Sequence, residues 1–297
     1  MIHRLETFLW SMRRYASRSA FLVKLLRLKR PGAGKPARGL VIIQIDALSR
    51  KQFEKALDTG YMPFVKHLID TQQYRCHANY PGMPGTTPAV QGELFYGVPQ
   101  CIPAFHYYDH QAARTFIMFN PRDARTVEER LEQKGNPLLK DGSSYANIYT
   151  GGADEAHFCI TSIGLGYLFR RWFPLGFALF MILHAYSMLR TAVLILIETG
   201  LAISDFSRSL IKGRDLWKEL KLIPSRVGLC VFLREVSTIG AKSDISRGLP
   251  IIHVNYIGYH EQSHRRGATS RFAHWTLRGI DDAIKRVWRA AHREHAR

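Results

Sequence analysis

Two histidines and a glutamate near the carboxyl end of the sequence match a pattern that is typical of zinc enzymes. His260-Glu-Gln-Ser-His264 fits the H-E-x-x-H motif. On a helix, residues four positions apart share one face, so the two imidazoles could hold Zn²⁺ while Glu261 polarises a water molecule. However, Ser270 stands where the longer form of the motif has its third ligand, and no methionine follows Met188. A zinc metalloprotease is therefore the less favoured hypothesis.

A second set of chemically capable residues is spread over most of the chain. Asp46 ends an apolar run, and Thr86-Thr87-Pro88 follows 40 residues later. Gly142-Ser-Ser-Tyr-Ala-Asn147 and Thr150-Gly-Gly152 come next, and Asn255–Gly267 contains the histidine pair. In their order and spacing, these segments resemble the alkaline phosphatase superfamily, specifically its type I phosphodiesterase/nucleotide pyrophosphatase branch. The resemblance runs from about residue 39 to the end of the sequence.

The resemblance implies a particular chemistry. In that family an aspartate at the end of the first strand binds a metal ion, and Asp46 matches it. A threonine or serine two residues before a proline binds the same metal and is the nucleophile, which assigns this role to Thr86, with Thr87 as the fallback. A hydroxyl attacks phosphorus readily only when a cation stabilises its alkoxide. The resemblance thus implies hydrolysis or transfer of phosphoric esters through a covalent phosphothreonine, with two divalent metals, Zn²⁺ in the complete family site.

The second metal site departs from the family pattern. The family holds this ion with an aspartate and a histidine four residues later, but here His260 occupies the aspartate position and only His264 is retained. Imidazole binds zinc, yet replacing a carboxylate raises the positive charge of the site and should weaken metal binding. A further Asp-His pair and a late histidine of the family have no counterpart. We therefore expect the N-terminal part of a longer enzyme, with weak or partial metal binding and impaired turnover; a non-catalytic, membrane-associated protein with the same core is the alternative.

The pattern of apolar residues in the segments around these residues predicts an α/β fold. Gly39–Asp46 is an apolar, β-branched run, typical of a parallel strand in the centre of a sheet with both faces buried. Residues 50–70 show the spacing of a crossover helix, and residues 78–104 read as a structured loop. Val227–Leu233 and Leu249–Ile257 predict further buried strands. Together they indicate a mostly parallel sheet flanked by helices, an incomplete alkaline-phosphatase-like core.

The last segment predicts an amphipathic helix. Thr269 or Ser270 can cap its start. Its apolar residues recur at 4-3-4-3-4 spacing and so share one stripe: Ala273, Leu277, Ile280, Ile284, Val287 and Ala291.

The charge of the chain is concentrated at its two ends. The 297 residues carry 42 Lys and Arg against 24 Asp and Glu, a net charge of +18. Residues 1–38 contribute +9 and residues 265–297 contribute +6. No stretch interleaves basic and aromatic residues as an RNA-binding sheet does, so we expect an anionic membrane surface as partner and no specific nucleic acid. Four scattered cysteines without C-x-x-C spacing exclude a disulfide scaffold and a cysteine-ligated zinc module.

The domain organisation follows from these patterns. Residues 1–38 read as a basic amphipathic arm and linker, whose apolar run is too short and too charged for a cleavable signal peptide. Residues 39–297 form the α/β domain, with an apolar helical insertion at 160–206. Within the insertion, Trp172–Leu189 runs 18 residues without a charge, whereas a bilayer span needs about 20. A membrane-embedded helix or hairpin and a buried helical pair both fit this run. We expect membrane association, and otherwise a cytoplasmic location.

Overall fold

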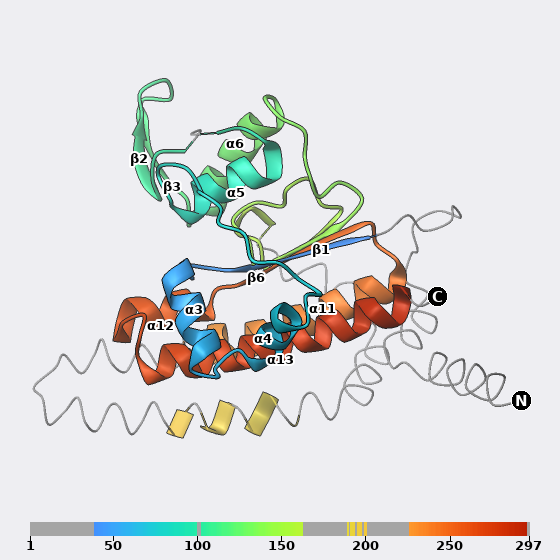
Figure 1. Cartoon of the computed structure of the whole chain (residues 1–297). Coiled ribbons are helices and arrows are strands. Elements are labelled where there is room, and N and C mark those ends of the chain that lie inside the picture. The colour runs from blue at the N-terminus through green and yellow to red at the C-terminus, as the bar shows by residue number, and fades with distance from the viewer. Residues whose placement is uncertain are drawn as a thin grey trace, which may run out of the picture.

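A parallel sheet between two layers of helices forms the centre of the structure (Figure 1). The computed structural model describes residues 39–99, 102–162 and 226–295, with short helical pieces between 189 and 200. The four strands of the sheet pair in parallel in the order β1-β6-β4-β5, and their bounds are Leu40–Ile45 (β1), Ser143–Tyr145 (β4), Glu155–His157 (β5) and Ile251–Tyr256 (β6). The predicted α/β fold with a mostly parallel sheet flanked by helices is confirmed.

Helices cover both faces of this sheet. On one face lie α5 (Thr87–Tyr96) and α6 (Pro121–Glu132), beside an antiparallel hairpin of β2 (His106–Asp109) and β3 (Arg114–Ile117). The other face is covered by five helices: α3 (Arg50–Asp58), α4 (Pro63–Asp70), α11 (Arg234–Arg247), α12 (Gly258–Arg266) and α13 (Arg271–His295). Two short elements, η1 (Ile160–Ser162) and the π-helix η2 (Arg226–Leu233), complete the described part of the chain.

Strand β6 has the interior position that we predicted for β1. All six residues of β6 are buried, and it pairs with β1 on one side and with β4 on the other. Strand β1 lies at the edge of the described sheet and is only half-buried over most of its length. The prediction of a central β1 was therefore wrong. An apolar run indicates that both faces of a strand are covered by helices. It does not indicate whether the strand pairs with one neighbouring strand or with two.

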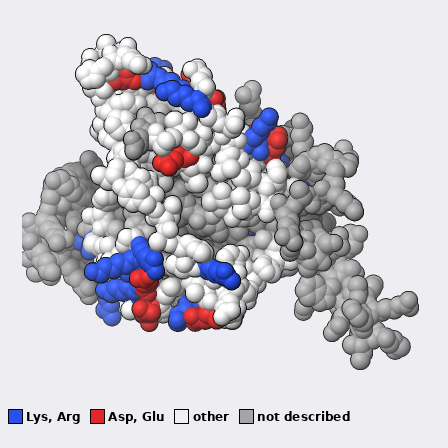
Figure 2. All heavy atoms as spheres, turned by 45° about the horizontal axis from the view of Figure 1, so that its top comes forward, with Lys and Arg blue, Asp and Glu red and all other residues white. Residues whose placement is uncertain are grey.

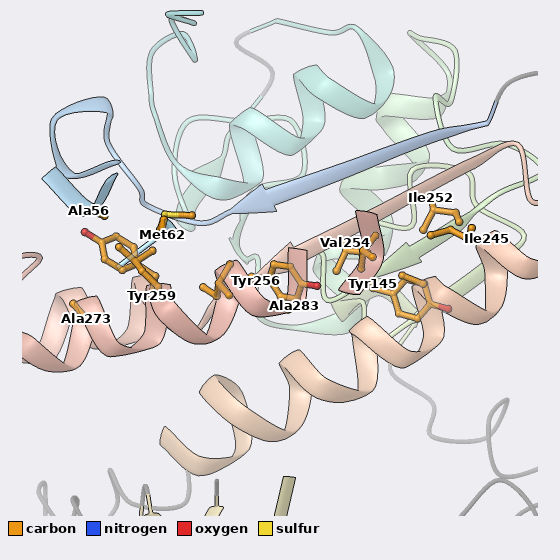
Figure 3. Close-up of a cluster of buried hydrophobic side chains, with 14 residues drawn as sticks. Ala56, Met62, Tyr145, Ile245, Ile252, Val254, Tyr256, Tyr259, Ala273 and Ala283 are labelled. Carbon is orange, nitrogen blue, oxygen red and sulfur yellow. The ribbon is translucent and has the colours of Figure 1, made fainter. Parts of the chain in front are cut away.

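The predicted amphipathic helix is α13, and its apolar stripe packs against β6. Ala273, Leu277, Ile280 and Val287 are at most 2% exposed, and Figure 3 shows β6 side chains pointing toward this helix. Of the two predicted caps, Ser270 accepts a hydrogen bond from the backbone N–H of Ala273 at 3.2 Å. Burial of the stripe is the main source of stability for such a helix, because helix propensity alone is marginal in water.

Two of the predicted elements differ in the structure. Residues 227–233 were expected as a strand but belong to η2, which continues directly into α11. Residues 78–104 were expected as a loop but contain α5, whose proline lies in the first helical turn, where its missing N–H costs nothing. A short apolar run does not distinguish a buried strand from a buried helix by its periodicity, and this ambiguity explains the first error.

The arm at residues 1–38 and most of the insertion at 160–206 lie outside the described residues. The short helical pieces between 189 and 200 belong to this insertion. None of the helices in the described part of the chain is long and apolar enough to cross a membrane.

Candidate functional site

The carboxyl ends of β1 and β6 bring two distant segments of the chain together. In a parallel sheet these ends lie at the same edge, where open α/β sheets bind their ligands. Ile45 pairs with Tyr256, and the backbone N–H of Asp46 donates to the Tyr256 carbonyl at 3.3 Å. The chain leaves β6 through Ile257 and enters α12 at once. The first turn of α12 therefore stands beside Asp46.

The Asp46 carboxylate lies between an imidazole and a hydroxyl. Its Oδ2 is 2.7 Å from Nδ1 of His260, in the first turn of α12. The Thr87 hydroxyl, at the start of α5, donates to the same carboxylate at 3.2 and 3.3 Å from its two oxygens. The side chains of His260 and Asp46 are 27% and 12% exposed, so solvent reaches both partners. Three elements thus converge on one carboxylate: β1, α5 and α12.

The pKa of His260 is raised by this contact. The hydrogen bond to Asp46 favours the charged imidazolium, and the negative charge of the carboxylate adds to the effect, while partial burial opposes it. The site therefore favours an imidazolium–carboxylate pair.

The next residue after Asp46, Ala47, has a left-handed backbone with φ 59°, which turns the chain sharply out of β1. A left-handed alanine costs of order 1 kcal/mol and persists only where its surroundings hold it.

The two neighbouring threonines occupy different positions. Thr86 is the N-cap residue of α5, with an extended backbone, and its hydroxyl is buried without a hydrogen-bond partner in the described part of the chain. Thr87 is the first residue of α5, and its hydroxyl is the one that meets Asp46. The expected nucleophile was Thr86, with Thr87 as the fallback. The structure brings the fallback residue to the carboxylate.

His264 lies one helical turn after His260, so the H-E-x-x-H segment is helical, as the motif requires. The two rings are 4.5 Å apart and tilted by 33°. His264 is exposed, and its ring lies beside that of His260. Of the two histidines, His260 is the one that forms a hydrogen bond with Asp46. The structure therefore brings Asp46, Thr87 and His260 together, with His264 adjoining through ring contact.

A tightly held metal ion does not fit this set of side chains. A structural or catalytic zinc takes three or four protein ligands. Among the residues that the structure describes, no group of three His, Cys, Asp or Glu side chains is placed to hold a metal ion. The Asp46 oxygens are already engaged by His260 and Thr87. We therefore derive no chemical step through a metal.

A buried polar network anchors α5 above the sheet. The Gln91 amide donates to Oδ1 of Asn147 at 2.9 Å and accepts from the backbone N–H of Ile148 at 2.8 Å. It also contacts Gln44 of β1 at 3.3 Å. Asn147 in turn lies 3.0 Å from Nδ1 of His253, on β6. These contacts fix the orientation of α5 and therefore position Thr87, one turn earlier on the same helix.

The residues of this network carry no motif that assigns them a role from the sequence alone. Gln44 and His253 are polar residues inside apolar runs, and that interruption was the available signal. His253 is 0% exposed, and burial lowers its pKa to about 4, so the ring is neutral at physiological pH. Ser144 and Asn147 are buried, and the Asn147 amide donates a hydrogen bond to the Ser144 hydroxyl at 2.8 Å.

Comparison with known proteins finds no relative. No family model matches the chain, and no curated protein or solved structure matches it either. The resemblance to the alkaline phosphatase superfamily rests on the residues described above.

Proposed function

We propose that this domain is a phosphoester hydrolase or phosphotransferase in which the Thr87 hydroxyl attacks phosphorus. The observation that carries the proposal is the contact between this hydroxyl and the Asp46 carboxylate, at the carboxyl edge of a parallel sheet. Thr87 also stands at the N-terminus of α5, where the helix dipole favours a bound anion. The chain carries an aspartate at a strand end, then a threonine at a helix start, then a histidine. The superfamily that the sequence resembles has its matching residues in the same order.

The chemistry would use side chains of this chain. As the Thr87 Oγ–P bond forms, the bond from phosphorus to the leaving oxygen breaks and the hydroxyl proton passes to Asp46. The leaving group takes its proton from water, and a second water then hydrolyses the phosphothreonine ester. His260 keeps Asp46 in place through the bond at 2.7 Å. A carboxylate is a far weaker base than an alkoxide, so this step is slow without a cation beside the oxygen.

Low turnover is therefore part of the proposal. The family site uses two divalent metals, and we propose at most weak or partial metal binding here. The second candidate, a non-catalytic member of the same fold, is favoured by the absence of a three-ligand group among the described residues. The two candidates differ in whether Thr87 reacts.

Hydrolysis of bis(p-nitrophenyl) phosphate, measured by p-nitrophenol release, tests the proposal. Thr87→Val replaces the hydroxyl with a methyl group of similar size, and Thr86→Val is the matched control one residue earlier. We expect slow release by the wild-type chain, loss in Thr87→Val and retention in Thr86→Val. Release at the buffer rate by the wild-type chain would favour the non-catalytic candidate. Loss in Thr86→Val with retention in Thr87→Val would return the role to the residue that the sequence favoured.

The protease hypothesis has a separate test. Helix α12 places His260 and His264 on one face, which is the observation in its favour. If the motif acts as in zinc proteases, Glu261→Gln should abolish zinc-dependent peptide cleavage. We expect no peptide cleavage from the wild-type chain, and cleavage that depends on Glu261 would overturn the phosphoester proposal.

A further inference from the structure

One face of α13 presents a mostly cationic row of side chains that is separate from the candidate site. Its members recur at the spacing of one helical stripe and lie opposite the apolar stripe that packs on the sheet. Four of them are exposed and two are half-buried. We call this row the α13 stripe: Arg271, Trp275, Arg278, Asp282, Lys285 and Arg289. Its first and last residues lie 18 positions apart, about 27 Å at 1.5 Å per residue.

The α13 stripe carries excess positive charge. Four of its residues are cationic and one is a carboxylate, so its sum is +3. The carboxylate, Asp282, already pairs with Nε of Arg286 at 3.1 Å. Trp275 stands among the cations with 44% of its surface exposed.

Charges on the neighbouring helices are arranged differently. Arg50 pairs with Glu54 on α3 at 2.7 Å, and Lys66 pairs with Asp70 on α4 at 3.3 Å. On the face seen in Figure 2, blue and red side chains likewise lie next to each other. Internal pairing of this kind leaves little field to attract a partner, whereas the α13 stripe keeps its excess charge.

The rest of α13 is held in the domain. Its apolar stripe packs on β6, and Asp281 accepts hydrogen bonds from the first-turn N–H groups of α4 at 2.9 and 3.0 Å. Arg286 forms a double hydrogen bond with Glu235 of α11, each at 2.8 Å. The helix therefore cannot turn its apolar face outward. The α13 stripe therefore stays exposed to a partner while the opposite face of the helix is held against the domain.

We propose that the α13 stripe binds the surface of an anionic bilayer. A straight row of cations matches a plane of negatively charged headgroups, and each basic residue near such a surface adds to the attraction. The exposed indole of Trp275 suits the headgroup layer, where tryptophan places an apolar ring beside a polar N–H. This contact is independent of the +9 arm at residues 1–38 and of the candidate phosphoester site. It orients the sheet-bearing domain against the bilayer through α13.

Vesicle co-sedimentation of the full chain tests this proposal. Binding is measured at about 0.1 M salt to vesicles of phosphatidylcholine with and without phosphatidylserine. The difference between the two measurements is the binding that depends on anionic lipid. The test variant is Arg271→Gln/Arg289→Gln, two exposed members of the stripe. Its matched control, Arg122→Gln/Lys140→Gln, removes the same charge from exposed positions outside α13.

The stripe variant should lower the phosphatidylserine-dependent partition coefficient about thirtyfold, because each of its two lost cations is worth about a fivefold change at an anionic membrane surface. The control pair should change it less than about threefold. Trp275→Ala should also weaken binding to these vesicles. Equal losses in the two pairs, or no preference of the wild-type chain for phosphatidylserine, would overturn the proposal. So would a stripe variant that binds vesicles normally but loses binding to single-stranded RNA, since that result would identify nucleic acid as the partner.

Discussion

Acidification should destabilise this protein through His253, an imidazole inside the central strand. The ring is 0% exposed and meets Phe95 edge to face at 4.8 Å. Its Nδ1 accepts from the Asn147 amide at 3.0 Å, and that amide is oriented because its oxygen accepts from Gln91 at 2.9 Å. A proton on Nδ1 would face the amide N–H group and would place an unpaired charge in the core. The folded protein therefore disfavours the imidazolium.

The size of this effect follows from the shift in pKa. Burial lowers the pKa of His253 from 6.5 to about 4, so the unfolded chain binds the proton more readily than the folded one. The contribution to stability is complete above the unfolded pKa and is lost as the pH falls toward the folded pKa. Between about pH 7.5 and about pH 5 the free energy of unfolding should fall by about 2 kcal/mol on account of this group.

Urea unfolding of the wild-type chain and of His253→Asn at these two pH values measures the effect. Asparagine keeps an amide oxygen near the position of Nδ1 and does not titrate. The variant should be less stable at both pH values because it loses the ring, but its stability should fall by about 2 kcal/mol less between them. His260 titrates in the opposite sense, with a raised pKa, and its contribution cancels because both proteins retain it.

His67→Asn is the control for this prediction, because it makes the same replacement at an exposed position outside the core. If His253→Asn and the wild-type chain lose the same free energy between the two pH values, the imidazole does not carry the pH dependence. The description of a neutral, fully buried His253 would then be wrong.

Two further substitutions test the packing that supports the site. Glu235→Gln should lower the free energy of unfolding by about 2 kcal/mol in urea titrations, because the Arg286 guanidinium loses its buried carboxylate and keeps the half-exposed Asp282 as a charged partner. Wild-type stability of Glu235→Gln would contradict this. Gly142→Ala should destabilise by about 1–3 kcal/mol, since a Cβ would lie 2.1 Å from the Ile251 carbonyl oxygen. Gly85→Ala meets no atom within 4 Å and is its control; equal thermal shifts for the two variants would refute the packing argument.

Much of the fold could be predicted from the residue pattern. The stripe of α13 and the strand at Ile251–Tyr256 were predictable because each buries a regular set of apolar side chains. Strand order was not predictable, since β1 and β6 have similar apolar runs and differ only in their neighbours. The helical conformation of Val227–Leu233 was missed because seven apolar residues suit either a buried strand or a buried helix.

The candidate site was predictable in its residues but not in its contacts. Asp46 and His260 were named from their motifs, yet their direct bond depends on the pairing of β1 with β6 across 214 positions of the sequence. The choice between Thr86 and Thr87 depends on which residue is the N-cap of α5, and adjacent residues of the same type give no signal for it. The Gln91 network depends equally on three-dimensional packing.

Mapping a covalent adduct tests the central claim most directly, namely that the Thr87 hydroxyl is the nucleophile. The full chain is incubated with bis(p-nitrophenyl) phosphate, quenched in acid, digested and analysed by tandem mass spectrometry. We predict a p-nitrophenylphosphoryl group on Thr87, which is absent from Thr87→Val and still present in Thr86→Val. An unmodified Thr87 in a chain that releases p-nitrophenol, or an adduct on Thr86, would contradict the account.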